Sequence, residues 1–176
     1  ERFIIRLFSP VTTIGGGEII DVDIKGKWKE IKRHMNSLFN DNKYYMLSLI
    51  SKYGIKPLTK AGFSKLFNMS DKQILNLLES NSTIIEINFK NYNWILTDFQ
   101  NNNNNNIILS LVKDFHKKYK YRSGISKEEI VQLSASEVNY VNYVIDRLIV
   151  NGEIEKKNNV ISILGYKYSL SDRENK

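Results

Sequence analysis

The chain has 176 residues, a formal charge of +7 and no cysteine. At about 100–150 residues per typical domain, this length allows one medium domain or two small ones. The lack of cysteine excludes a disulfide scaffold, a thiolate zinc site and a cysteine nucleophile, and no apolar run approaches the roughly 20 residues of a membrane-spanning helix. We therefore expect a cytoplasmic protein, and the start at Glu1 rather than at a methionine leads us to expect part of a longer one.

The positive charge is spread evenly along the chain. Residues 1–40 and residues 41–100 each contain seven basic and five acidic groups, and residues 101–176 contain twelve and nine. An even excess of this size supports weak attraction to phosphate groups, but it does not mark a surface that reads a nucleic-acid sequence.

Residues 1–24 are predicted to form short β-strands. Residues 2–8 are rich in β-branched and aromatic side chains, and Ser9-Pro10 ends that run. Two or three short strands cannot bury a core alone, so we expect them to belong to a barrel or to pack on the next domain. The glycines at 15–17 lack the Gly-Lys-Ser/Thr of a phosphate loop, and we expect instead a bulge or a tight connection with closely spaced backbones.

Residues 25–40 are predicted to form a basic amphipathic helix that connects the strands to the next domain. Its lysine and arginine side chains either face solvent or contact nucleic acid. The apolar residues that recur at helical spacing are Trp28, Ile31, Met35, Leu38 and Phe39.

Three helices and then a hairpin are predicted in residues 41–100. Thr59 and Ser70 are suitable N-caps for the second and third helices. Alternating apolar residues on both sides of Lys90-Asn91 are typical of two strands joined by a tight turn. The expected bounds are 43–53, 59–67 and 71–79 for the helices, and 84–89 and 92–96 for the strands.

Residues 101–106 are all asparagine. Asparagine has poor helix propensity, and the run offers nothing apolar to bury. We therefore predict a linker or a loop for these six positions.

The pattern of three helices and a hairpin recurs after the asparagine run. Ser126 is expected to cap the second of these helices in a capping box with Glu129, and Ser136 to cap the third. Gly152 is expected to end the third helix in the left-handed conformation. The expected bounds are 107–119, 127–133 and 136–150 for the helices, and 154–156 and 160–163 for the strands.

This repeated order predicts the fold class and the domains. A mainly α chain with small β-hairpins is expected, built of tandem winged-helix domains that β-strands precede. The predicted parts are terminal strands at 1–24, a connecting helix at 25–40, a first winged helix at 41–100, an asparagine-rich linker at 101–106 and a second winged helix at 107–171.

The third helix of each predicted winged helix has few groups suited to reading DNA. Recognition helices enter the major groove and use Arg or Lys for guanine, whereas these helices begin with Asp71 and Glu137, as the helix macrodipole favours. The side chains expected to point outward are Asp71, Lys72, Gln73, Asn76 and Glu79 in the first, and Glu137, Asn139, Tyr140, Asn142, Tyr143 and Asp146 in the second.

Basic side chains gather elsewhere, interleaved with Tyr119 and Tyr121. Such a mixture suits contact with an RNA backbone and stacking on its bases. Cations at the end of a helix are also explained by the macrodipole, and they then face solvent. The candidates for auxiliary contact with RNA or the ribosome are Lys117, Lys118, Lys120, Arg122, Lys156 and Lys157.

No residue is predicted to be catalytic, cofactor-binding or metal-ligating. His34 and His116 are the only histidines, and each is isolated in a chain without cysteine, which argues against a metal site. No Ser–His–Asp arrangement is suggested, so catalysis by this chain alone is not expected.

The N-terminal strands carry a family resemblance. The run Arg2-Phe3-Ile4-Ile5-Arg6, followed by Ser9-Pro10-Val11-Thr12-Thr13-Ile14-Gly15-Gly16-Gly17-Glu18-Ile19-Ile20-Asp21, resembles the end of the barrel domain of translational GTPases. In particular, it is similar to the bacterial selenocysteine-specific elongation factor, which has four C-terminal winged helices. The ending Gly165-Tyr166-Lys167-Tyr168-Ser169-Leu170 resembles the strand that closes the second of them.

The resemblance implies a function for the whole protein and a narrower one for this chain. Members of that family bind GTP with Mg and selenocysteinyl-tRNA through N-terminal domains, deliver the tRNA to the ribosome, and bind the selenocysteine-insertion hairpin of the mRNA through their last winged helices. The GTPase domain is absent here, so this part is expected to be no enzyme and to hold no cofactor. It would act as a spacer, or coupling arm, between the tRNA-binding body and the hairpin-binding end, with at most weak RNA contact.

Two other interpretations stay open. A tandem winged-helix transcription regulator would bind DNA, but it has no need of the strands at 1–21. A winged-helix protein-interaction module would expose an apolar patch, for which Tyr140 and Tyr143 are the candidates unless they pack between the domains.

Overall fold

The computed structural model describes residues 2–19, 27–29, 31–32 and 42–167, which form two compact units, Glu1–Tyr45 and Met46–Lys176. The predicted connecting helix at 25–40 lies largely outside the described residues, although its described positions at 28–29 and 31–32 are helical. Residues 168–171, at the end of the predicted second winged helix, also lie outside them. No helix in the described parts of the chain has both the length and the apolar composition needed to cross a membrane.

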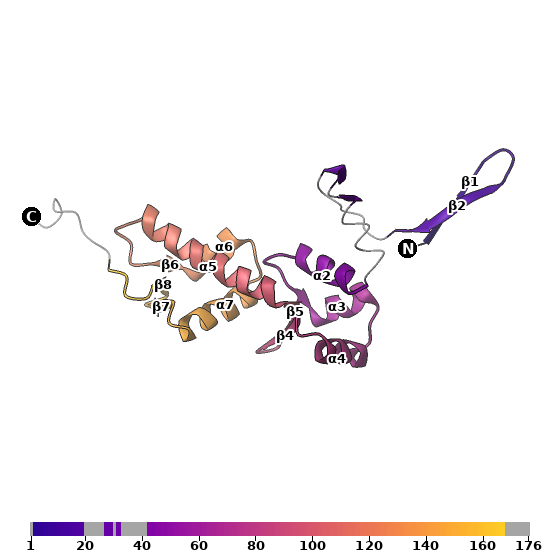
Figure 1. Cartoon of the computed structure of the whole chain (residues 1–176). Helices are drawn as coiled ribbons and strands as arrows, with labels where there is room; N and C mark the ends of the chain where they lie inside the picture. Colours follow the sequence, from indigo (N-terminus) through magenta and orange to yellow (C-terminus); the bar gives the residue numbers. More distant parts are fainter. Residues whose placement is uncertain (1, 20–26, 30, 33–41, 168–176) are drawn as a thin grey trace, which may run out of the picture. The chain divides into compact units, whose positions relative to one another are not determined.

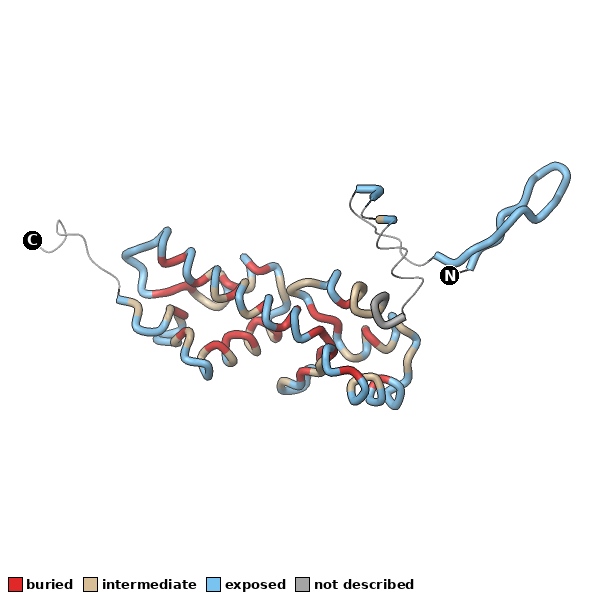
Figure 2. Tube along the Cα trace, viewed as in Figure 1, coloured by how far each residue is buried: buried red, intermediate tan, exposed pale blue. Residues whose placement is uncertain are grey.

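The first unit contains an antiparallel hairpin of β1 (Arg2–Arg6) and β2 (Thr13–Glu18). Every described residue from 2 to 19 is exposed, as the blue tube in Figure 2 shows, so these strands bury no core of their own. Their pairing shifts by one residue between Ile5 and Arg6, which leaves Ile14 of β2 without a partner and makes a bulge there.

The glycine run lies inside β2 rather than in a connection. A Cβ atom at Gly16 would come within 2.7 Å of the Phe3 carbonyl oxygen, and one at Gly17 would come within 2.9 Å of the Phe3 ring. The expected close approach of backbones is therefore confirmed, and it explains why side chains are excluded here.

The second unit, counted together with the first turn of α2 that precedes it at residues 42–45, contains the same order of elements twice. We call residues 42–97 the first segment; its sheet has the strand order β3-β5-β4, with all pairs antiparallel. Thr59 caps its second helix by accepting from the Gly62 N–H at 3.0 Å, and Lys90 turns the hairpin with a φ of 54°. Its elements are α2 (Asn42–Lys52), β3 (Leu58–Thr59), α3 (Lys60–Phe67), α4 (Asp71–Ser80), β4 (Ile84–Phe89) and β5 (Tyr92–Thr97).

We call residues 98–167 the second segment; its sheet has the equivalent order β6-β8-β7. The capping box of Ser126 and Glu129 is confirmed, and Gly152 has the predicted left-handed conformation with a φ of 73°. Its elements are α5 (Asp98–Lys118), β6 (Ile125–Ser126), α6 (Lys127–Ser134), α7 (Val138–Val150), β7 (Ile154–Lys157) and β8 (Val160–Ile163). A mainly helical chain with small antiparallel sheets is thus confirmed.

The prediction of a linker or loop at 101–106 is wrong. These residues lie inside α5, an unbroken helix of 21 residues that leads from the end of β5 into the second segment (Figure 1). Thr97 caps this helix by accepting from the Gln100 N–H at 3.0 Å, and Asn101 and Asn104 are buried. Tertiary contacts therefore override the low helix propensity of asparagine.

Candidate functional site

The two segments of the second unit meet at an aromatic surface. Trp94 on β5 is 0% exposed, and its ring lies edge-on to that of Tyr140 on α7, with 5.3 Å between centroids. Tyr143, one helical turn further along, contacts Phe89 with 5.8 Å between centroids. We call the surface formed by Phe89, Trp94, Asn104, Tyr140 and Tyr143 the seam.

Hydrogen bonds extend the seam to the loop after α2. The Asn104 side-chain amide donates to Tyr140 Oη at 3.0 Å and to the carbonyl oxygen of Gly54 at 3.2 Å. The Ser136 hydroxyl donates to the Ile55 carbonyl oxygen at 2.6 Å. Burial raises the pKa of Tyr140 to about 12, so its hydroxyl stays protonated in the folded protein.

These contacts correct two predictions about α7. Ser136 does not cap the helix; Glu137 occupies the N-cap, because the Ser136 hydroxyl is engaged by the first segment. Tyr140 does not point outward but is fully buried, and Tyr143 is partly buried. The alternative expectation, that these two tyrosines pack between the segments, is confirmed.

The third helix of the first segment is arranged differently. α4 buries only Ile74, and Asp71, Lys72 and Gln73 in its first turn are exposed. The Gln73 side chain accepts from the Ser70 N–H at 2.8 Å, which stabilises the start of the helix.

The basic residues predicted near the end of α5 are partly engaged within the protein. Lys117 pairs with Asp114 at 3.0 Å, and Arg122 pairs with Glu129 of α6 at 3.2 Å. The Arg122 guanidinium also lies 4.8 Å from the centroid of the Phe115 ring. Arg122 therefore fixes the loop after α5 to α6.

The pKa of Glu129 is lowered by the Ser126 backbone N–H first and by Arg122 in addition. This carboxylate thus stabilises both the start of α6 and the loop after α5.

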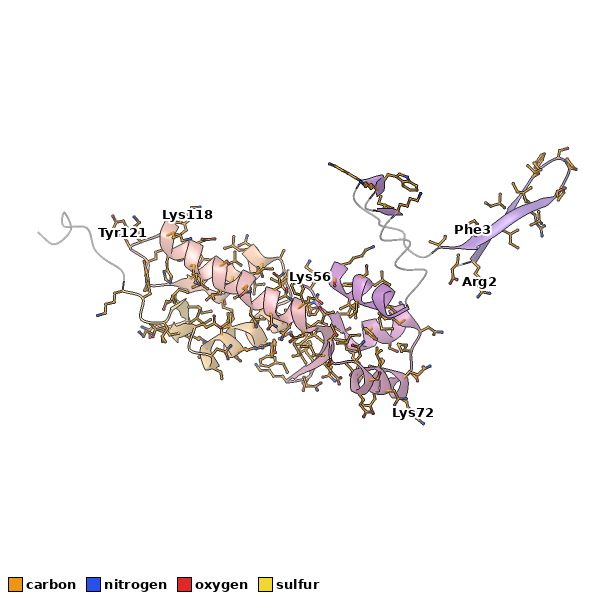
Figure 3. The ribbon with its side chains drawn as sticks, viewed as in Figure 1. Arg2, Phe3, Lys56, Lys72, Lys118 and Tyr121 are labelled. Carbon is orange, nitrogen blue, oxygen red and sulfur yellow. The ribbon has the colours of Figure 1, made fainter. Side chains whose placement is uncertain are left out.

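The remaining candidates are exposed. Lys118 lies over the Tyr119 ring at 5.2 Å, and Figure 3 shows it with Tyr121 at the end of α5. Lys120 follows in the turn. On β7, Lys156 is exposed and Lys157 pairs with Glu155 at 2.9 Å.

His116 has a structural environment. Its ring stacks on Tyr166 with 3.5 Å between centroids, and its Nε2 accepts from the Ile163 N–H at 3.3 Å. Burial lowers the pKa of His116, which favours the neutral imidazole that this hydrogen bond needs. Within residues 2–19, 27–29, 31–32 and 42–167, no group of three His, Asp or Glu side chains is placed to hold a metal ion; His34 lies outside this part.

Sequence reasoning missed a cleft beside the β4–β5 turn. It has a volume of about 400 Å³ and lies between this turn and the first turns of α3 and α4. Tyr92 is 39% exposed at the cleft, and its ring stacks on Trp94 at 5.6 Å with an angle of 8° between the planes. The lining residues are Thr59, Lys60, Ala61, Asp71, Asn91, Tyr92 and Asn93.

Most of the second segment is similar to a known family of domains. Residues 109–163, from the middle of α5 to the end of β8, match the family model described as elongation factor SelB, winged helix. No curated protein matches the chain. Residues 109–163 are therefore a SelB-like winged helix.

Proposed function

We propose that the chain is part of a bacterial selenocysteine-specific elongation factor and serves there as a coupling arm. The arm would hold the end that binds the mRNA hairpin at a set distance and orientation from the body that binds GTP and selenocysteinyl-tRNA. The SelB winged-helix match at 109–163 supports this assignment, as does the resemblance of residues 2–21 to the end of a translational-GTPase barrel.

The main support for a coupling arm is that α5 and the seam join the two segments. A helix of 21 residues is about 30 Å long at 1.5 Å per residue, and α5 begins directly after β5, the last strand of the first segment, with no linker between them. Trp94 and Tyr140 are both fully buried where the segments meet. An arm that transmits position needs such a joint rather than a flexible linker.

Two further parts of the proposal rest on local structure. The first segment has the element order and the sheet order of the second, so we assign residues 41–100 to a winged helix as well. The exposed apolar side chains of the β1–β2 hairpin, among them Phe8 and Val11, suit a strand pair that completes a barrel. In this proposal GTP and Mg are bound by other domains, and this part performs no catalysis.

The competing functions fit the geometry less well. A DNA reader presents the start of its third helix to the major groove, but the start of α7 packs on the first segment through Ser136 and Tyr140. α4 is exposed, but it begins with Asp71, which repels phosphate. A protein-interaction patch at Tyr140 and Tyr143 is covered by the seam.

The proposed RNA contact is auxiliary and generic. Lys118, Lys120 and Lys156 are exposed cations on the second segment and are available to a phosphate backbone. Lys117, Arg122 and Lys157 would first have to leave the carboxylates that they pair with.

Binding of the chain to a labelled selenocysteine-insertion hairpin, across a salt series, tests the proposal. An unrelated hairpin and duplex DNA are the controls. We expect weak binding that falls with salt and does not distinguish the two hairpins. A salt-resistant preference for the insertion hairpin would mean that these segments read the mRNA themselves, and the arm would be the wrong description.

A further inference from the structure

The sheet of the first segment ends at an open strand. In the strand order β3-β5-β4, β5 has a neighbour on both sides, whereas β4 pairs with β5 alone. β4 has six residues, as many as β5, so its outer side is unpaired along its full length within the described part of the chain. Such a strand presents a row of backbone N–H and C=O groups with which another strand can pair. We call this outer side of β4 the free edge.

The backbone groups on the free edge follow from the pairing of β4 with β5. The Asp98 N–H donates to the Thr83 carbonyl oxygen at 3.0 Å, so these two residues form a hydrogen-bonded pair just before β4 begins. Hydrogen-bonded and non-hydrogen-bonded pairs alternate along an antiparallel ladder, so every second residue from Ile85 onward bonds to β5. The N–H and C=O groups of Glu86 and Asn88 therefore point outward. No hydrogen bond between described residues engages them.

The equivalent edge of the second segment is protected by charge, and the free edge is not. β7 has only four residues, and the side chains of Lys156 and Lys157 are exposed on it. Short edge strands and lysines are common means by which proteins prevent strands from pairing. β4 has a single charged residue, Glu86, whose side chain is 20% exposed and pairs with Lys60 at 3.0 Å. The free edge thus lacks the features that keep a further strand away.

The side chains of β4 are complementary to those of a second β4 in one register. If two copies run antiparallel with Ile87 opposite Ile87, Glu86 lies opposite Asn88 of the partner subunit. Ile85 then lies opposite Phe89 of the partner subunit, and the outward groups of Glu86 and Asn88 bond reciprocally. Polar side chains meet polar ones, and apolar side chains meet apolar ones. The alternative register with Glu86 opposite Glu86 sets two carboxylates against each other, which is unfavourable.

We propose that the chain forms a two-fold symmetric dimer in which the free edges of two copies pair antiparallel, centred on Ile87. The partner is thus a second copy of this chain, and the two sheets of the first segments become one continuous sheet. The inference goes beyond the coupling arm and does not depend on it. It uses outward backbone groups of β4, whereas the seam is formed by side chains.

Sedimentation equilibrium over a concentration series measures the association. We expect the mass to rise from the 20.5 kDa of one chain towards twice that value between about 1 µM and about 1 mM, the range of weak complexes. Amide hydrogen exchange in the same series locates the interface. Exchange at Glu86 and Asn88 should slow as the concentration rises, whereas Ile85 and Ile87, already bonded to β5, should exchange slowly throughout.

Charge substitutions at Asn88 test the register. Asn88→Asp places a second carboxylate opposite Glu86 at two symmetric positions, and it should weaken the dimer about tenfold. Asn88→Lys should instead strengthen the dimer severalfold. Asn88 is exposed, so both variants should fold like the parent. Asn103→Asp makes the same change of charge at an exposed position of α5; it is the matched control and should leave the dimer unchanged.

Asn88→Pro tests the edge itself, because it removes one of the outward N–H groups. An edge strand tolerates proline where the N–H faces away from the sheet, so this variant should stay folded and become monomeric. If circular dichroism shows that Asn88→Pro is unfolded, the charge substitutions decide instead.

Three results would overturn the inference. The first is a chain that stays monomeric up to about 1 mM. The second is protection of Glu86 and Asn88 that does not depend on concentration, which would mean that another strand of the same chain occupies the free edge. The third is a dimer that Asn88→Asp and Asn88→Lys affect equally. None of these results bears on hairpin discrimination, which tests the arm.

Discussion

The two segments of the second unit share one order of elements and differ in what their third helices contact. In the first segment α4 buries Ile74 alone and leaves its polar first turn exposed. In the second segment α7 buries five residues, and Tyr140 among them lies against Trp94 of the first segment. The same position in the fold is therefore an open surface in one copy and an internal joint in the other.

This difference shows that the third helix of such a fold is not by itself a nucleic-acid reader. A fully buried tyrosine at the start of α7 is incompatible with insertion of that helix into a groove. The basic end of α5 is exposed instead. Substitutions at Trp94 and Asn104 test the strength of the joint, and substitutions at His116, Lys117 and Arg122 test contacts within the second segment.

Trp94→Ala should have the largest effect, because it removes the residue that links both sides of the seam. Loss of a fully buried tryptophan typically costs about 3–5 kcal/mol of unfolding free energy. Urea unfolding should also change from one transition to two, as the segments lose their common contact. Trp28→Ala, at a side chain that is 71% exposed, is the control. If both substitutions lowered the unfolding free energy equally, the seam would not be what stabilises the second unit.

Asn104→Ala should come next, and the asparagine run supplies its own control. The substitution removes the donor to the buried Tyr140 hydroxyl, at a cost of about 1–3 kcal/mol, whereas the Gly54 carbonyl still accepts from Gln100. Asn103→Ala, at an exposed position, should instead stabilise α5 by roughly 0.5 kcal/mol, because alanine is the better helix former. The midpoint temperatures of thermal unfolding of the two variants should shift in opposite directions. Equal shifts would show that the contacts of Asn104 in the seam add nothing to stability.

His116 should make the second segment sensitive to mild acid. Its pKa is lowered by burial in the folded protein, so the unfolded chain takes up the proton first as the pH falls through about 6.5. The unfolding free energy should therefore decrease between about pH 7 and pH 5, and His116→Gln should flatten that slope. Chemical denaturation at a series of pH values measures how the unfolding free energy depends on pH. If His116→Gln left this dependence unchanged, other groups would be its cause.

The surface ion pair at Lys117 should matter least. Lys117 and Asp114 are both largely exposed, so Lys117→Ala should leave stability unchanged within error. Arg122→Ala should cost more, roughly 1 kcal/mol, since Arg122 also packs on the Phe115 ring. If Lys117→Ala were the more damaging of the two, the assignment of Arg122 as the residue that fixes the loop would be wrong.

Much of the fold was predictable because its signals are local. The caps at Thr59, Ser70 and Ser126, the left-handed Gly152 and the alternation in each hairpin act within a few residues, and all were found in the sequence. The helix at the asparagine run was not predictable from the sequence. It depends on burial against Gly54 and Tyr140, which lie 50 and 36 residues from Asn104 along the chain.

The candidate site was less predictable, because its contacts also join residues that lie far apart in the sequence. The partners of Ser136 and of Trp94 lie in the other segment, so no local pattern shows that α7 is covered. The ion pair of Arg122 with Glu129 depends on how the loop after α5 folds back on α6. The cleft beside the β4–β5 turn combines three separate pieces of chain, so it appears only in three dimensions.

The most direct test of the joined segments is a distance measurement between spin labels on their two far surfaces. The chain has no cysteine, so Lys72→Cys and Tyr121→Cys, both at exposed positions labelled in Figure 3, give specific attachment. Pulsed electron paramagnetic resonance should report one narrow distance distribution, which Tyr143→Ala broadens by weakening the seam. A broad distribution in the parent chain would mean that the segments move independently, and the coupling arm would have no structural basis.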